Sequence, residues 1–301
     1  MININMSTLD IKGIKPVIIN FPNGEFKTIL EELPDSKNYT IIVQTDQNPI
    51  KMIFATSMII NIVKGKNPEK IIVVHPWLSF SRQDKRFYPL EPLSLELILT
   101  WYDTLGVTDL IAFDIHAIQF RKPGLHKWGN NLNIHNINFV SSLYDQNYPI
   151  MSPTDEQEPF LVEIEQKGIR ITYFKKEKIC LNCKKVQQEC VCEGGIKQEI
   201  VLTPLTKITS DKALLIDDII SGGGTMLEAV KTLKNNGVKD INVAVTHGFF
   251  DGESAKKIFD QVNSVTISNT IQIKKELQNK KNIRIKRIEE KLKNYLENLL
   301  N

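Results

Sequence analysis

The chain has 301 residues, of which 42% are hydrophobic and 24% are charged, a balance typical of globular proteins and not of disordered ones. Its 38 basic and 35 acidic residues leave a formal charge of +3, which argues against a dedicated nucleic-acid-binding protein. The first residues lack the pattern of a signal peptide, and the longest apolar stretch, 52–63, is too short to span a membrane. We therefore expect a cytoplasmic protein that binds neither membranes nor nucleic acid.

Short β-branched runs alternate with longer amphipathic stretches along the chain. The expected strands lie at 40–44, 70–76, 110–116, 169–174, 213–219, 241–248 and 264–269. The expected helices lie at 49–64, 92–105, 224–236 and 253–259, and leucines at helical spacing within 292–299 indicate a terminal helix docked on the body. Strands that are apolar on both faces and separated by helices favour parallel sheets covered on each side. The predicted fold class is α/β, and the length favours two such units.

The strongest single motif follows the strand predicted at 213–219, which ends in two adjacent acids, Asp217 and Asp218. A glycine-rich loop comes next and leads directly into a helix; it consists of Ser221, Gly222, Gly223, Gly224 and Thr225. Glycines let backbone N–H groups turn inward, and a helix N-terminus adds partial positive charge, so this pattern is typical of a phosphate-binding site. The two acids suit the hydroxyls of a ribose. A purely structural glycine-rich turn would not require the acid pair.

A second polar cluster follows the strand predicted at 70–76. It contains the run RQDKR at 82–86 and with it two of the six arginines of the chain. Such a cluster is suited to clamping a polyphosphate, although an isolated charged turn at the surface would be the commoner case.

These motifs resemble those of known enzymes. The acids and glycine-rich loop resemble the ribose 5-phosphate motif of type I phosphoribosyltransferases, with Gly222 in the place of the motif's first Thr, and do not fit a P-loop or GxGxxG. The stretch 75–94 resembles the ATP-binding loop of ribose-phosphate pyrophosphokinases, also called 5-phosphoribosyl diphosphate (PRPP) synthetases. FPNGE at 21–25, DIH at 114–116 and two segments within 245–271 resemble further motifs of that family in the same order. The resemblance runs from about Phe21 to the C-terminus.

The resemblance implies two tandem type I phosphoribosyltransferase-like domains, each a mainly parallel sheet flanked by helices. They would comprise residues 1–140 on the ATP side and 141–301 on the ribose 5-phosphate side. The implied activity is ribose-phosphate diphosphokinase, which transfers the diphosphate of ATP to the 1-hydroxyl of ribose 5-phosphate to give PRPP and AMP with Mg²⁺ as cofactor. Because the family's adenine loop acts on a neighbouring subunit, the resemblance also implies a homodimer or a higher homo-oligomer.

The site residues are carried over by position. The residues implied to bind ATP are Phe21, Asn23, Glu25, Arg82, Gln83 and Asp84. Those implied to bind ribose 5-phosphate are Asp217, Asp218, Ser221, Gly222, Gly223, Gly224 and Thr225. His116 is implied to be a Mg²⁺ ligand.

Three departures from the family pattern matter. The chain before Phe21 is shorter than expected, which predicts a reduced opening strand and helix. The family segment S-P-D-x-G-G reads SPTDEQ at 152–157, so Thr154 takes the place of the acid and both glycines are gone. Asp155 would supply a Mg²⁺ ligand only after a shift of one residue.

The third departure concerns the catalytic loop, where Lys176 and Lys178 take the places of a K-x-R pair. Lysine neutralises phosphate but lacks the bidentate fork of arginine, so slower or altered chemistry is expected. The alternative is that both lysines are ordinary surface residues of a lysine-rich chain.

A cysteine-rich insertion in this loop holds every cysteine of the chain: Cys180, Cys183, Cys190 and Cys192. Four thiolates so close together can surround one tetrahedral Zn²⁺, and clustered cysteines of cytoplasmic proteins more often bind metal than form disulfides. We predict a structural Zn²⁺ or another thiophilic metal, with free or redox-active thiols as the alternative.

These features allow three functions. The retained acid pair, glycine loop, RQDK run and His116 favour an active PRPP synthetase. SPTDEQ, the missing arginine and the insertion favour a non-catalytic paralogue that binds nucleotide or a catalytic subunit and regulates it. A phosphoribosyltransferase that acts on a base is disfavoured because RQDK and FPNGE belong to the ATP side.

Overall fold

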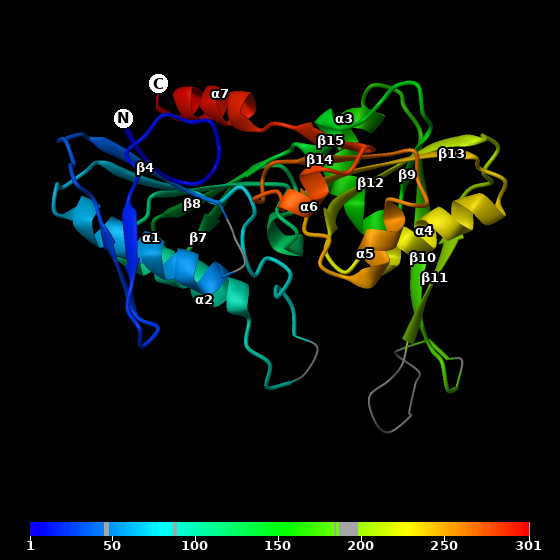
Figure 1. The fold of residues 1–301 in the computed structure, drawn as a ribbon, viewed down its shortest axis with the longest axis horizontal. Helices are drawn as coiled ribbons and strands as arrows, with labels where there is room; N and C mark the ends of the chain where they lie inside the picture. Colours follow the sequence, from blue (N-terminus) through cyan, green and yellow to red (C-terminus); the bar gives the residue numbers. More distant parts are fainter. Residues whose placement is uncertain (45–47, 87–88, 184, 187–197, 301) are drawn as a thin grey trace. The chain divides into compact units, whose positions relative to one another are not determined.

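The computed structural model describes residues 1–44, 48–86, 89–183, 185–186 and 198–300 (Figure 1). The chain divides into two compact units. Unit 1 contains residues 1–139, 269–272 and those from 287 onward, and unit 2 contains residues 140–268 and 273–286. Each unit is built on its own mainly parallel sheet flanked by helices, which confirms the predicted α/β fold class.

The sheet of unit 1 has the strand order β1-β4-β5-β6-β8-β7, and only the β7–β8 pair is antiparallel. The strands are β1 (Ile2–Met6), β4 (Asn38–Val43), β5 (Lys70–Val74), β6 (Asp109–Phe113), β7 (Gly124–Trp128) and β8 (Leu132–Ile137). Helices α1 (Pro49–Lys64) and α2 (Ser94–Leu105) cover one face of this sheet and α7 (Glu289–Leu300) covers the other (Figure 1). A short 3₁₀ helix, η1 (Ile118–Phe120), follows β6. A separate hairpin is formed by β2 (Val17–Asn20) and β3 (Phe26–Ile29).

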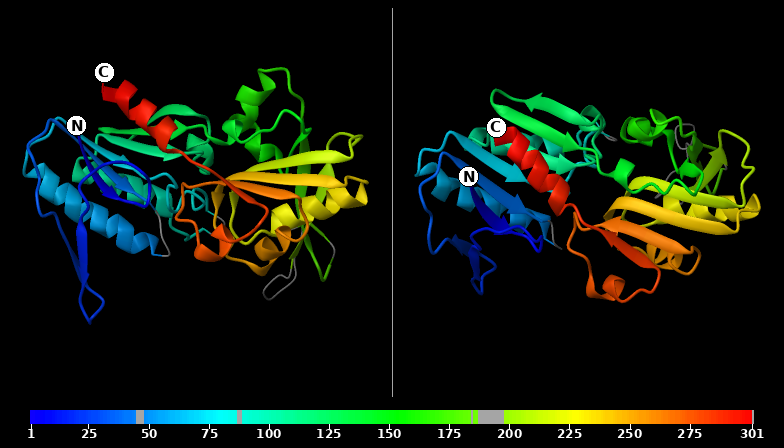
Figure 2. Two further views of the ribbon diagram at one scale, coloured as in Figure 1. Left: turned by 45° about the horizontal axis from the view of Figure 1, so that its top comes forward. Right: turned by 90° about the horizontal axis from the view of Figure 1, so that it is seen from above.

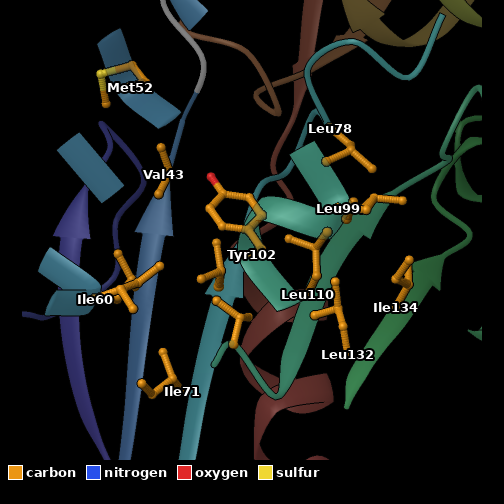
Figure 3. Packing of buried hydrophobic residues seen from close by; sticks show 14 of the residues in the cluster. Val43, Met52, Ile60, Ile71, Leu78, Leu99, Tyr102, Leu110, Leu132 and Ile134 are labelled. Carbon is orange, nitrogen blue, oxygen red and sulfur yellow. The ribbon is translucent and has the colours of Figure 1, made fainter. Parts of the chain in front are cut away.

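Local sequence explains the predicted helices of unit 1. The Asn48 side chain accepts a hydrogen bond from the N–H of Lys51, and Pro49 occupies the first turn of α1, where its missing N–H costs nothing. Helix α2 ends at Gly106, whose positive φ of 84° favours glycine. The apolar sides of both helices pack on the sheet in one core, and Figure 3 shows its labelled members around Tyr102.

Helix α7 is the predicted terminal helix, and it packs on unit 1 through the buried side chains of Leu292 and Leu296. At its start, the buried Glu289 carboxylate accepts hydrogen bonds from the N–H of Asp10 at 3.1 Å and from Asn269 Nδ2 at 2.9 Å. Burial acts to raise the pKa of Glu289, but these hydrogen bonds outweigh it and lower that pKa. Hydrogen bonds therefore join segments from the two ends of the chain in unit 1.

The sheet of unit 2 has the strand order β11-β10-β9-β12-β13-β14-β15, and only β10 and β11 are antiparallel. The strands are β9 (Ile150–Ser152), β10 (Ile171–Cys180), β11 (Gln198–Pro204), β12 (Lys212–Ile220), β13 (Asp240–Gly248), β14 (Ser264–Ser268) and β15 (Ile283–Lys286). Helix α3 (Glu158–Glu165) covers one face, while α4 (Gly224–Asn235) and α5 (Glu253–Ile258) cover the other (Figure 2). Shorter helical elements are η2 (Val140–Ser142), η3 (Asp155–Gln157) and α6 (Lys275–Gln278).

Each strand and helix predicted from the apolar pattern is present, and its ends agree within about three residues except in β10. That strand continues to Cys180, six residues beyond the predicted end at 174, because it pairs with β11 over this length. Residues 1–44 contain four strands and no helix. Within the described part of the chain, none of the helices has the length and apolar character that crossing a membrane requires.

Candidate functional site

The acid pair of unit 2 lies near the end of the central strand β12. Both Asp217 and Asp218 are buried, and the N–H of Asp218 donates to Asp217 Oδ1 at 3.0 Å. Burial and the neighbouring negative charge of Asp218 raise the pKa of Asp217 well above its usual range, which the positive charge of Lys176 partly offsets. Near neutral pH the pair therefore holds a proton more readily than two exposed aspartates would.

The glycine-rich loop is folded tightly against the start of α5. A Cβ on Gly223, which has a φ of 81°, would lie 2.4 Å from Ala255 Cα, so only glycine fits there. Gly223 caps α4 without a side chain, which leaves the first backbone N–H groups of that helix for an anion. Gly222 differs, because its φ is ordinary and a Cβ on it would meet no atom within 4 Å. The loop thus has the form of a phosphate cradle.

The two lysines of the expected catalytic loop lie on β10, which pairs with β11 in a long antiparallel hairpin. Lys176 and Lys178 are exposed and, being two residues apart in a strand, share one face of it. Lys176 is near enough to Asp217 for its positive charge to act against the rise in the pKa of that acid. Lys175 lies on the opposite face, paired with Glu177 at 3.1 Å. The positive charge of Lys176 therefore lies within electrostatic range of the acid pair.

The SPTDEQ segment follows β9, the strand next to β12 in the sheet. Thr154 is buried, and its hydroxyl accepts a hydrogen bond from the N–H of Glu156 at 3.3 Å, which caps η3. Asp155 is exposed at the start of η3. Gln157 is buried, and its Nε2 donates to Asp218 Oδ1 at 3.0 Å. Sequence reasoning missed Gln157 and recorded at that place only the loss of a glycine.

The expected adenine loop forms the turn between β2 and β3 in unit 1. Phe21, Asn23 and Glu25 are all exposed, and the N–H of Phe21 donates to the carbonyl of Glu25 at 2.7 Å. Asn23 Nδ2 donates to Glu25 Oε2 at 2.8 Å, so the two polar side chains lie side by side. The turn therefore carries one exposed aromatic side chain and two hydrogen-bonding side chains.

The remaining ATP-side residues lie on two loops that follow β5 and β6. Arg82 and Gln83 are exposed, whereas Asp84 Oδ2 accepts a hydrogen bond from the N–H of Ile118 at 2.8 Å. His116, between β6 and η1, has a partly buried side chain, and its carbonyl accepts from both Nε and one terminal nitrogen of Arg121. Asp84 therefore joins the RQDK loop to the loop that carries His116.

The cysteines are described only in part. Cys180 is buried at the end of β10, and Cys183 is partly buried in the turn that follows. The N–H of Cys180 donates to the carbonyl of Lys185 at 2.9 Å, which closes this turn. Cys190 and Cys192 lie outside the described residues. Over the described residues, no three His, Cys, Asp or Glu side chains are grouped as a metal site.

Two family models match the chain. The N-terminal domain of ribose phosphate pyrophosphokinase matches residues 4–106, and the phosphoribosyl synthetase-associated domain matches residues 176–292. The ribose-phosphate pyrophosphokinase of Methanobrevibacter smithii is 28% identical over 264 residues, covering 83% of this chain and 84% of the relative. The chain belongs to the ribose-phosphate pyrophosphokinase family. A second relative with that name, from Pyrococcus abyssi, is 26% identical over 265 residues, which are 84% of this chain and 83% of that protein.

The crystal structure of phosphoribosylpyrophosphate synthetase from Mycobacterium smegmatis is similar to this fold, with a TM-score of 0.79 and 17% identity. The match covers 99% of this chain and 98% of that one. Together with the two parallel-dominated sheets, it confirms the fold of two tandem phosphoribosyltransferase-like domains. The family resemblance predicted from the motifs is thereby confirmed, whereas the roles of individual site residues stay predictions.

Proposed function

We propose that this chain is a ribose-phosphate diphosphokinase that makes PRPP and AMP from ATP and ribose 5-phosphate. The observation that carries the proposal is the grouping, in unit 2, of a phosphate cradle, a buried acid pair and Lys176. The two family models match the domain expected to bind ATP and the domain expected to bind ribose 5-phosphate. These matches support the proposal, since a purely regulatory protein would not need to keep both binding sites.

In this proposal the residues hold two substrates in position and neutralise charge, as phosphoryl transfer generally requires. The loop 221–225 binds the 5-phosphate, and Asp217 and Asp218 bind ribose hydroxyls. The 1-hydroxyl loses its proton as its oxygen bonds to the β-phosphorus of ATP, and AMP leaves as the bond between the α,β-bridging oxygen and that phosphorus breaks. Lys176 and Lys178 neutralise the diphosphate in transfer.

On the ATP side, Phe21 stacks on adenine, Asn23 and Glu25 contact its polar edge, and the RQDK loop contacts the phosphates. His116 and Asp155 are the proposed side chains for Mg²⁺, which would neutralise phosphate charge. Mg²⁺ usually binds through one or two side chains plus substrate phosphates and water, so the absence of a three-ligand cluster among the described residues is compatible with it.

The test is to incubate the purified protein with ATP, Mg²⁺ and ribose 5-phosphate and to measure AMP and PRPP. We expect the two products in equal amounts. A folded protein that forms no AMP with any divalent metal would overturn the proposal and leave the regulatory paralogue in its place.

Lys176→Ala locates the chemistry within that assay. Because Lys176 is proposed to act on the diphosphate, the change should depress turnover far more than the affinity for ribose 5-phosphate. Lys175→Ala is the matched control, since Lys175 lies one residue away on the opposite face of β10. Equal losses in turnover and affinity for Lys176→Ala would place the catalytic loop elsewhere.

We also propose that Cys180, Cys183, Cys190 and Cys192 bind one Zn²⁺. Support comes from their spacing and from the closed turn between Cys180 and Lys185. Elemental analysis of the purified protein should find one zinc per chain, and Cys183→Ser should reduce it. Metal-free protein in which mass spectrometry finds cysteine pairs as disulfides would favour redox-active thiols instead.

We propose further that the protein is cytoplasmic and forms a homodimer or a higher homo-oligomer. Exposed apolar side chains on the β2–β3 hairpin and the start of α1 support self-association: Val17, Ile19, Phe21, Ile50 and Phe54. Analytical ultracentrifugation at assay concentrations should show no monomer, and a purely monomeric active enzyme would contradict the proposal.

A further inference from the structure

Gln157 makes an incomplete set of hydrogen bonds beside the acid pair. Its side chain is 2% exposed, and its Nε2 donates to Asp218 Oδ1 at 3.0 Å. Its Oε1 is buried and has no hydrogen-bond partner among the described residues. The orientation of the amide follows from chemistry, since an ionised carboxylate accepts only and would repel the amide oxygen. The nitrogen therefore faces Asp218, and the carbonyl is left over.

A buried acceptor without a partner is rare in folded proteins and calls for an explanation. This one belongs to a side chain that already contacts the proposed ribose site. Two hydrogen bonds link the three residues in series. Gln157 Nε2 donates to Asp218 Oδ1, and the N–H of Asp218 donates to Asp217 Oδ1. A sugar hydroxyl has one donor to give, and an unpaired carbonyl next to two carboxyl groups is a suitable acceptor.

The charges of the group agree with this geometry. Donation from Gln157 favours the ionised form of Asp218, while burial beside that charge keeps the pKa of Asp217 raised. The site therefore combines the carboxyl acceptor of Asp218, a second carboxyl that holds a proton readily and a neutral acceptor. Two adjacent hydroxyls, each able to donate and accept, match such a set.

We propose that Gln157 is a positioning and specificity residue for the sugar. Its N–H groups orient Asp218, and its carbonyl accepts a hydrogen bond from a ribose hydroxyl. The inference rests on the proposed function. It also goes beyond the family pattern, since Gln157 stands where the segment S-P-D-x-G-G has a glycine without a side chain.

The test is calorimetric binding of ribose 5-phosphate and, separately, of inorganic phosphate, both without ATP. Gln157→Met keeps the length of the side chain and removes its donor and its acceptor. We expect it to weaken ribose 5-phosphate binding about tenfold, the loss typical of one buried hydrogen bond, and to leave phosphate binding unchanged. Phosphate is the matched reference because it needs the loop 221–225 and not the sugar contacts.

Two results would overturn the inference: unchanged binding of ribose 5-phosphate, or equal losses for both ligands, which would indicate a distorted loop. Gln157→Ala provides a second variant in case the thioether does not fit, and it should show the same selective loss. In turnover assays the KM for ribose 5-phosphate should rise more than kcat falls. A failure of this inference can be told apart from a failure of the proposed function. A parent protein that does not bind ribose 5-phosphate at all contradicts the proposed function itself.

Discussion

The carboxylate of Asp84 accepts a hydrogen bond from the backbone N–H of Ile118, with 2.8 Å between Oδ2 and the nitrogen. The two residues are 34 positions apart, on the loops that follow the neighbouring strands β5 and β6. The family resemblance implies that Asp84 binds ATP directly. Its observed contact gives it a second use, because it fixes the backbone next to His116.

Substitutions of Asp84 separate these two roles. Asp84→Asn keeps an acceptor oxygen for Ile118, whereas Asp84→Ala does not. Because the hydrogen bond to Ile118 fixes the loop, we expect Asp84→Ala to raise the KM for ATP about tenfold and Asp84→Asn to stay near the parent value. Steady-state kinetics at saturating ribose 5-phosphate provides the measurement. Equal defects in both variants would mean that the negative charge itself acts on ATP or its metal.

His75 predicts a loss of stability in acid. It is fully buried beside Tyr102, with 2.7 Å between Nε2 and the phenol oxygen, and burial lowers its pKa from 6.5 to about 4. Between these values the unfolded chain binds the proton and the folded one does not, so stability is complete above pH 6.5 and falls as pH decreases toward 4. We expect about 2 kcal/mol less stability from this group at pH 5 than at pH 7.5.

Urea unfolding of the parent and of His75→Leu at the two pH values checks this expectation. The parent should lose more stability between pH 7.5 and 5 than the variant does. The same pH dependence in both proteins would show that other groups are responsible. The comparison uses the difference between two pH values, so a uniform change in stability caused by the substitution does not affect it.

Side-chain hydrogen bonds through His135 join helix α7 to the sheet of unit 1. His135 lies 2.8 Å from Asp109 through Nε2 and 3.0 Å from the hydroxyl of Tyr295 through Nδ1. Tyr295→Phe keeps the ring and removes the partner of Nδ1, which should cost about 1 kcal/mol and loosen α7. Hydrogen exchange of the α7 amides should become faster. Lys293→Ala, on the exposed side of the same helix, is the control, and equal protection in all three proteins would contradict the expectation.

The phosphate loop has room for a gain of function at Gly222. Its φ is ordinary and a Cβ there meets no neighbour within 4 Å, so Gly222→Thr adds the hydroxyl of the related motif without strain. We expect about fivefold tighter binding of ribose 5-phosphate by calorimetry. Gly223→Ala, one residue further, should instead destabilise the loop because of its positive φ and the contact with Ala255. Weaker binding by Gly222→Thr would show that the hydroxyl does not reach the phosphate.

Local sequence was sufficient to predict the helices and strands that are apolar or that begin with a capping residue. The run from 213 to 219 is buried along most of its length, and α1 begins at the Asn48–Pro49 pair that predicts it. Strand β8 was not predicted, because it buries His135 and Asn136. Their partners are Asp109 and the carbonyls of Phe120 and Arg121, more distant along the chain, so no apolar period marks the strand.

Part of the candidate site can also be predicted from local sequence. The acid pair and its glycine loop are adjacent in sequence, and their chemistry can be recognised there. Gln157 is 61 positions from Asp218, and they meet only because β9 lies next to β12 in the sheet. Neither residue type nor spacing indicates that contact. The register of the strands is therefore the information that the motifs lacked.

The hydrogen bond from the N–H of Asp10 to Glu289 has a consequence for biosynthesis. A ribosome makes the residues of unit 2 between the first 139 residues of unit 1 and the α7 segment that covers its sheet. Domains usually fold in the order in which they emerge, but here the nascent first unit must wait with one face of its sheet uncovered until the last helix has been translated. A stalled or prematurely terminated chain would therefore expose that face, which makes such fragments substrates for chaperones and proteases.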